Sequence, residues 1–231
     1  MTGLHVFFAA RRVSWLGAVV ASAVACSASP PPVNHGPHSP TAVVTRDTEF
    51  HGTLVDPPLH RPPVVLTTTD GQRFDLARRP SGRVTVLFFG FTHCDDVCPT
   101  TMADLAAARR ALPAGLRENL QVEFVTVDPA RDTPEVLRHW LDRYDDDFIG
   151  LNGSSNTVRR AEKSLYAPIS HLPRQTYGEE TAASPATRPH GYQIDHSGTV
   201  YVFAPRQRTL IYTGGTTPQQ YAQDFTHLLR S

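Results

Sequence analysis

A run of residues that are apolar except for Thr85, Val84–Phe89, ends at Gly90 and is the strongest pattern in the chain. A short apolar run bounded by a breaker predicts a β-strand buried on both faces. After Pro99, apolar residues recur at helical spacing with arginines on the other side, which predicts an amphipathic helix. Cys94 and Cys98 lie between these two elements, so we expect both thiols in the first turn of the helix. Unpaired backbone N–H groups there favour the thiolate form.

Similar patterns extend along the rest of the chain. Predicted strands are Gly52–Val55, Val64–Thr67, Gln72–Asp75, Leu120–Val127, Thr199–Phe203 and Thr209–Thr213, and predicted helices are Asp132–Tyr144, Ser154–Leu165 and Pro218–Leu229. Asp70-Gly71 predicts a hairpin turn, Asp132–Glu135 is expected to cap a helix, and Ala167–Gln193 is polar enough for an exposed loop. This order predicts an α/β domain with a thioredoxin-like fold, an N-terminal β-hairpin and an extra helix.

The N-terminal residues 1–26 have the features of an export signal. Arg11 and Arg12 precede the apolar stretch Val13–Ala25, and small residues lead into Cys26. This ending is similar to a bacterial lipobox, so Cys26 is the predicted lipidation site. Ordinary secretory cleavage, a retained anchor segment and twin-arginine export are the alternatives. We expect an exported protein on the outer face of the cytoplasmic membrane, anchored by lipid at Cys26.

Composition indicates one folded domain behind a tether. Residues 27–49 are rich in proline and serine and are expected to be flexible, and residues 50–231 are expected to form the domain. The chain has 22 basic and 22 acidic residues, so it lacks the net positive charge that would attract nucleic acid. No nucleic-acid partner is therefore expected. If Cys26 is lipidated, Cys94 and Cys98 remain as a pair in an oxidising compartment. A separate thiol reductant is then needed to keep them reduced.

The two cysteines, four residues apart, are within reach of one another and of one metal ion. Three intervening residues, instead of the two of thioredoxin-type redox pairs, suit a metal better than rapid exchange. Thiolates are soft donors that select Cu(I), zinc or iron–sulfur, and two of them make an incomplete site. His196, which follows the long loop and precedes a strand, is the best candidate for a third ligand. A hydrogen-bonded surface histidine is the alternative interpretation of His196.

Three blocks of sequence resemble the Sco/SenC family, the copper proteins of cytochrome c oxidase assembly. They are GFTHCDDVCPTTMADL, VTVDPARDTPEVLRHW and DHSGTVYVFAP, and the likeness covers about Phe50 to Leu229. The resemblance implies copper, as Cu(I) and also Cu(II), bound by Cys94, Cys98 and His196. It also implies transfer of copper to the dinuclear centre of cytochrome c oxidase subunit II. Some members of the family are credited with reducing the cysteines of that centre.

The chain departs from the family pattern at three places. Ala204 replaces a usual aspartate, Gly178–Arg188 lengthens the loop before the histidine, and Asp95-Asp96 replaces a commoner pair that contains proline. The first change removes an acidic group, and the second puts partner recognition in doubt. The third places two carboxylates beside the thiols, where they oppose ionisation but favour a bound cation.

Two further residues are candidates for supporting roles around the metal. His93 adjoins Cys94 but is expected to point away from it, as a structural or outer residue. Asp128 follows a central strand at the same sheet edge as the cysteines, where it either supports the site or caps its own loop. The predicted function is that of a copper carrier. A thiol-disulfide oxidoreductase using Cys94 and Cys98, and more remotely a peroxide-reducing enzyme, are the alternatives.

Overall fold

The computed structural model describes residues 43–45, 49–78, 80–170, 194 and 196–231. The strands are β1 Val43–Thr45, β2 Thr53–Asp56, β3 Val65–Thr68, β4 Arg73–Asp75, β5 Val84–Gly90, β6 Leu120–Thr126, β7 Ile149–Asn152, β8 Val200–Ala204 and β9 Arg208–Tyr212. The helices are α1 Val97–Ala111, α2 Ala114–Arg117, α3 Pro134–Leu141, α4 Ser155–Ser164 and α5 Pro218–Arg230, with a 3-10 turn at Pro205–Gln207.

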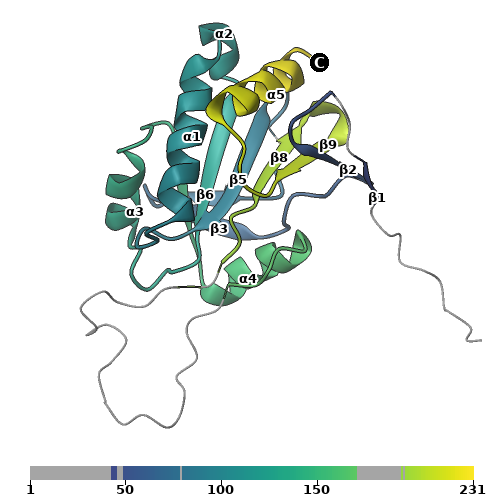
Figure 1. The fold of residues 1–231 in the computed structure, drawn as a ribbon. Helices are drawn as coiled ribbons and strands as arrows, with labels where there is room; N and C mark the ends of the chain where they lie inside the picture. The colour runs from purple at the N-terminus through teal and green to yellow at the C-terminus, as the bar shows by residue number, and fades with distance from the viewer. Residues whose placement is uncertain (1–42, 46–48, 79, 171–193, 195) are drawn as a thin grey trace, which may run out of the picture. The chain divides into compact units, whose positions relative to one another are not determined.

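The described strands form one mixed sheet in the order β1-β2-β9-β8-β5-β6-β7-β3-β4. At its centre β5 pairs in parallel with β6 and antiparallel with β8. All seven residues of β5 are buried, as expected for a strand covered on both faces. The sheet and its flanking helices give the predicted thioredoxin-like fold (Figure 1).

Both faces of the sheet are covered. On one face, Phe88 of β5 packs near Phe124 of β6, and Phe124 contacts Trp140 of α3. Helices α1 and α5 pack against one another on this face (Figure 1). On the other face, the buried guanidinium of Arg61 binds Glu123 of β6 and Thr85 of β5. The centre of the sheet is therefore shielded from water on both sides.

The pairing of β5 with β8 determines which strand ends meet at one end of the sheet. Phe88 of β5 lies opposite Val200 of β8, so the end of β5 and the beginning of β8 meet at one end of the sheet. Parallel β6 finishes there as well, because Gly90 pairs with Thr126. We call this the ligand end of the sheet, defined by Gly90, Thr126 and Val200.

The structure corrects several predicted boundaries. Strand β1 lies inside residues 27–49, predicted as tether, and its antiparallel pairing with β2 supplies the backbone partners that a free tether lacks. Strand β7 was not predicted, although it joins β6 to β3. Helix α2 occupies the stretch after α1 where only a break was expected. The hairpin of β3 and β4 is confirmed, with Thr67 opposite Arg73 across the Asp70-Gly71 turn.

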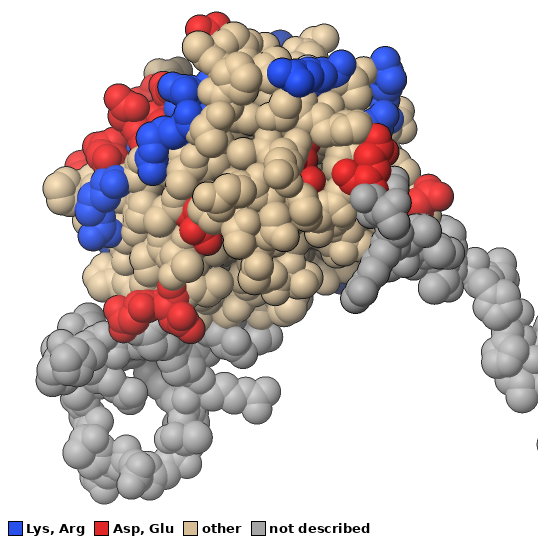
Figure 2. Space-filling model, turned by 45° about the horizontal axis from the view of Figure 1, so that its top comes forward, with Lys and Arg blue, Asp and Glu red and all other residues tan. Residues whose placement is uncertain are grey.

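Some predictions lie outside the described residues. These are the export signal, lipidation at Cys26, most of the tether, and the loop Ala167–Gln193 beyond Ser170. None of the helices in the described ranges combines the length and hydropathy that crossing a bilayer requires. On the face drawn in Figure 2, charged side chains of both signs lie mainly towards the periphery, and uncharged residues fill most of the middle.

Candidate metal centre

Cys94 and Cys98 lie at the ligand end, where the chain leaves β5 and enters α1. The predicted placement of both thiols in the first helical turn is wrong for Cys94, because α1 begins at Val97 with Asp96 as its N-cap. The Asp96 side chain makes no capping hydrogen bond. Instead, the backbone N–H of Cys98 donates to Sγ of Cys94 at 3.5 Å. The Cys94 sulfur therefore takes the position of a helix-capping acceptor.

His196 reaches the cysteines from the segment that leads into β8. Its Nε2 lies 3.1 Å from Sγ of Cys98 and 3.8 Å from Sγ of Cys94. Gly198 follows His196 by two residues, and Val97 lies between the two cysteines in the sequence. A β-carbon at Gly198 would lie 2.8 Å from Cγ2 of Val97. The absence of a side chain at Gly198 thus allows this segment to lie directly on the start of α1.

The histidine ring is oriented by its backbone and by an aromatic neighbour. Nδ1 of His196 lies 3.1 Å from the carbonyl oxygen of Ile194. A carbonyl only accepts hydrogen bonds, so Nδ1 carries the proton and the lone pair of Nε2 faces the sulfurs. Phe91 packs edge-on against the same ring, with centroids 5.1 Å apart. This is the arrangement in which an imidazole is ready to ligate a metal.

The two thiols have opposite tendencies to ionise. The thiol of Cys98 donates towards Cys94 and lowers the pKa of Cys94 well below its usual range, together with backbone N–H groups at the helix start. The same contact and burial raise the pKa of Cys98 far above its usual range. These opposite shifts favour ionisation of Cys94 before Cys98, and a bound cation would take the place of the Cys98 proton.

The donor set fits a single soft cation. Among the described residues, the ligand atoms of Cys94, Cys98 and His196 all lie within 4.8 Å of one another. Donors that share an ion at bond lengths of about 2.0–2.3 Å must lie within about twice that distance of each other. Two sulfurs and one imidazole nitrogen suit Cu(I) or zinc rather than a hard cation. Both cysteines are buried and His196 is partly exposed, so the site opens to solvent on the histidine side.

His93 and Asp128 lie next to the centre without belonging to the donor cluster. His93 is half exposed, and its Nδ1 contacts Oγ1 of Thr92 at 3.0 Å. Asp128 is buried and forms an ion pair with Arg131. The Arg131 guanidinium lies 5.7 Å from the centroid of Phe91, the ring that packs on His196. Asp128 therefore reaches the site through two intermediaries.

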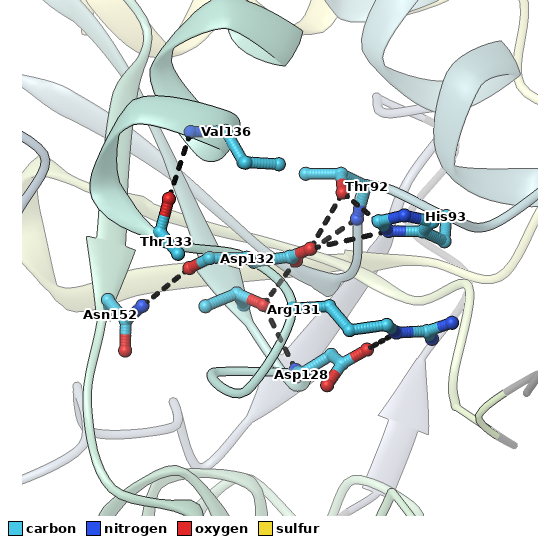
Figure 3. A network of polar contacts seen from close by, with 9 residues as sticks. Thr92, His93, Asp128, Arg131, Asp132, Thr133, Val136 and Asn152 are labelled. Carbon is cyan, nitrogen blue, oxygen red and sulfur yellow. Dashed lines mark hydrogen bonds and ion pairs between the residues drawn. The ribbon is translucent and has the colours of Figure 1, made fainter. Parts of the chain in front are cut away.

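Asp132 is the residue near the site whose role sequence reasoning missed. The stretch Asp132–Glu135 was expected to cap a helix, and within it Thr133 is the actual N-cap of α3. The buried carboxylate of Asp132 turns instead towards the cysteine loop (Figure 3). It accepts hydrogen bonds from the backbone N–H and hydroxyl of Thr92 and from the hydroxyl of Thr126. No sequence signal joins residues 40 positions apart in this way.

The fold and the site together define a class: thioredoxin-like proteins with two cysteines and one histidine around one point. A model of the SCO1/SenC family matches residues 55–230, and the chain belongs to this family. Members of the family include proteins solved with copper bound, and the Sco family is described as one of cytochrome c oxidase assembly proteins.

Individual relatives and solved structures support the same family assignment. A protein of Stutzerimonas stutzeri is 40% identical over 125 residues, which cover 54% of each chain. The copper-bound ScoI of Bradyrhizobium japonicum is 25% identical with a TM-score of 0.59, covering 73% of this chain and 99% of that one. Apo Sco1 of Thermus thermophilus is 33% identical with a TM-score of 0.58, covering 78% and 95%. The chain spans about half, or less, of the length of the first curated relatives it matches.

Proposed function

We propose that this protein binds one copper ion through Cys94, Cys98 and His196 and delivers it to the dinuclear copper centre of cytochrome c oxidase subunit II. The observation that carries the proposal is the cluster itself: two sulfurs and a correctly oriented imidazole nitrogen, all within 4.8 Å of one another. Copper is the cargo of this reaction, and the protein acts as a carrier, not as an enzyme.

Delivery is a ligand exchange in which no electrons move. An incoming thiolate of the acceptor forms a bond to copper as one of the bonds from this chain breaks. A three-coordinate site leaves room for that thiolate, and the partly exposed His196 gives it an approach. Once copper has left, Cys98 recovers its proton and Cys94 again accepts the hydrogen bond from it, because burial disfavours two adjacent thiolates.

The second candidate is a thiol-disulfide oxidoreductase that reduces the cysteines of the same copper centre. The ionised Cys94 favours it, because a thiolate is the attacking species in exchange. In this reaction Cys94 attacks a partner disulfide, and Cys98 then loses its proton and resolves the mixed disulfide. The partner gains two electrons, this chain ends as a disulfide, and a separate thiol reductant restores it.

The proposed location is the outer face of the cytoplasmic membrane, with the domain held by lipid at Cys26 and the tether between them. A SCO1/SenC family protein of Bacillus anthracis with the same fold is described as a lipoprotein. Metabolic labelling with a radiolabelled fatty acid tests the anchor, because Cys26→Ser should abolish labelling.

Competition with a chromophoric Cu(I) chelator tests the carrier function. The reduced wild-type protein should take up one Cu(I), and His196→Ala should lower the affinity by more than about 100-fold because a direct ligand is lost. His139→Ala is the matched control, since His139 is exposed on α3 outside the donor cluster. A wild-type protein that takes up no Cu(I) would exclude the carrier function. Retention of a measurable dithiol–disulfide couple in that protein would then favour the oxidoreductase.

A further inference from the structure

A buried carboxylate lies directly behind the cysteine loop. Asp132 is fully buried, and Oδ2 accepts from the backbone N–H of Thr92 at 3.0 Å and from Oγ1 of Thr126 at 2.6 Å. Oδ1 accepts from Oγ1 of Thr92 at 2.6 Å. Burying a carboxylate is costly unless it is hydrogen-bonded, and these three bonds offset that cost.

Thr92 belongs to the turn that positions the first cysteine. The backbone N–H of Cys94 donates to the carbonyl oxygen of Phe91 at 3.2 Å, so residues 91–94 form a β-turn with Thr92 at its second position. Asp132 holds Thr92 by both its backbone and its side chain. The carboxylate thereby restrains the turn that ends at Cys94.

The segment carrying Asp132 is itself fixed on two sides. Thr126 is the last residue of β6, and the side-chain amide of Asn152 at the end of β7 donates to the backbone oxygen of Asp132 at 2.7 Å. Figure 3 shows these contacts converging on the loop between β6 and α3. The cysteine turn is thus tied to two neighbouring strands of the sheet, not to its own helix alone.

We propose that Asp132 is a positioning residue of the copper site, which holds the Thr92 turn so that Cys94 faces Cys98 and His196. This inference rests on the proposed function, because it deepens the role of the same site. Asp132 does not ligate the metal. It acts through Thr92, and its removal should loosen the placement of the Cys94 sulfur.

Two substitutions separate geometry from charge. Asp132→Ala removes all three hydrogen bonds. Asp132→Asn keeps one oxygen for the Thr92 N–H and for Thr126, while its NH₂ donates to the Thr92 hydroxyl, which can rotate to accept. If positioning is the role, the asparagine variant should recover most of what the alanine variant loses.

Asp224 provides a matched control for a merely structural role. It is also buried, and it accepts from the backbone N–H groups of His51 and Gly52 and from the hydroxyl of Tyr212. None of these partners belongs to the segments that carry Cys94, Cys98 and His196. Asp224→Ala should therefore lower the unfolding midpoint much as Asp132→Ala does, without affecting the copper site.

The test measures Cu(I) affinity by chelator competition, the Cu(II)–thiolate charge-transfer spectrum, and the rate at which iodoacetamide alkylates Cys94 in the copper-free protein. We expect Asp132→Ala to weaken Cu(I) binding about 10- to 100-fold, as outer-shell changes do. It should also change the spectrum and accelerate alkylation, and Asp132→Asn should lie near wild type. If Asp132→Ala does not fold, Thr92→Val, which removes the hydroxyl alone, should show a smaller change in the same direction.

Equal effects of Asp132→Ala and Asp224→Ala on affinity, or no effect of either, would overturn the positioning role. So would an Asp132→Asn variant as impaired as the alanine variant. A wild-type protein without Cu(I) affinity would instead count against the proposed function. The alkylation rates of the copper-free variants would then still decide whether Asp132 restrains Cys94.

Discussion

Gly90 and Cys98 are packed so closely that a β-carbon at position 90 would lie 2.7 Å from Sγ of Cys98. The same β-carbon would lie 2.9 Å from the rings of Phe88 and Phe124. The last residue of β5 must therefore lack a side chain for the second sulfur to occupy its position. This close approach links the central strand directly to the donor cluster.

Gly90→Ala should destabilise the fold by about 1–3 kcal/mol, the usual cost of overpacking a core. It should also weaken Cu(I) binding, because the methyl group displaces the Cys98 sulfur. Denaturant unfolding and chelator competition measure the two effects. Gly115→Ala is the control, since nothing lies within 4 Å of a β-carbon there and neither quantity should fall. An unchanged Cu(I) affinity in Gly90→Ala would contradict the link.

Gly198 and Val97 make a second close approach, because a β-carbon at position 198 would lie only 2.8 Å from Cγ2 of Val97. Gly198→Ala should push the His196 segment off the start of α1 and weaken Cu(I) binding. Adding Val97→Ala to this variant should restore Cu(I) binding, because the smaller side chain leaves room for the new methyl group. Chelator competition on both single variants and the double variant gives the coupling energy. Additive effects in this cycle would show that the contact does not position His196.

The alkylation of Cys94 should depend only weakly on pH. Its pKa is lowered, so the thiolate persists as the pH falls, whereas an ordinary thiol loses about tenfold in reactivity per pH unit below a pKa of about 8.5. Iodoacetamide kinetics between about pH 6 and pH 8 should therefore be nearly flat. The contact with Cys98 is the largest cause, so Cys98→Ala should restore an ordinary slope. A steep profile in the wild type would show that Cys94 is protonated at neutral pH.

The ion pair of Arg61 and Glu123 should matter for stability and not for copper. Both side chains are buried, with 2.8 Å between Nη2 of Arg61 and Oε2 of Glu123. Arg61→Met leaves an unpaired buried carboxylate and should cost about 3–5 kcal/mol in the free energy of unfolding. Replacing both residues, as Arg61→Met with Glu123→Leu, should recover much of this loss. In contrast, Asp142→Asn breaks an exposed pair with Arg138 and should cost about 0.5 kcal/mol or less.

The fold could be predicted where buried elements have a strong hydrophobic pattern in the sequence. Strand β5, strand β6 and helix α5 are found close to their expected ranges, because long apolar runs and helical periodicity report the core directly. Strand β7 was missed because Ile149–Asn152 is short and contains Gly150, which weakens any strand pattern. Strand β1 was missed because Val43–Thr45 is only three residues long and follows a proline-rich stretch, although its β-branched residues favour a strand.

The candidate site was predictable only in part. The spacing of Cys94 and Cys98 indicated a pair of soft donors. The position of His196 before a strand made it the best third candidate, the family resemblance implied the same ligand, and the structure brings it within 3.1 Å of Cys98. The role of Asp132 could not be predicted. Its three donors come from Thr92 and Thr126, and a residue's tertiary hydrogen bonds leave no trace in local patterns.

The antiparallel pairing of β8 with β5 has a consequence for the order of folding. About a hundred residues separate the sulfurs from the imidazole, and the two parts meet only when β8 docks beside β5. A chain that has not yet emerged beyond β7 contains Cys94 and Cys98 but not His196, so a metal ion trapped early would lack this imidazole. All three ligands therefore come together only late in folding. A bound ion then stabilises the folded state by an amount that grows with its affinity for the complete site.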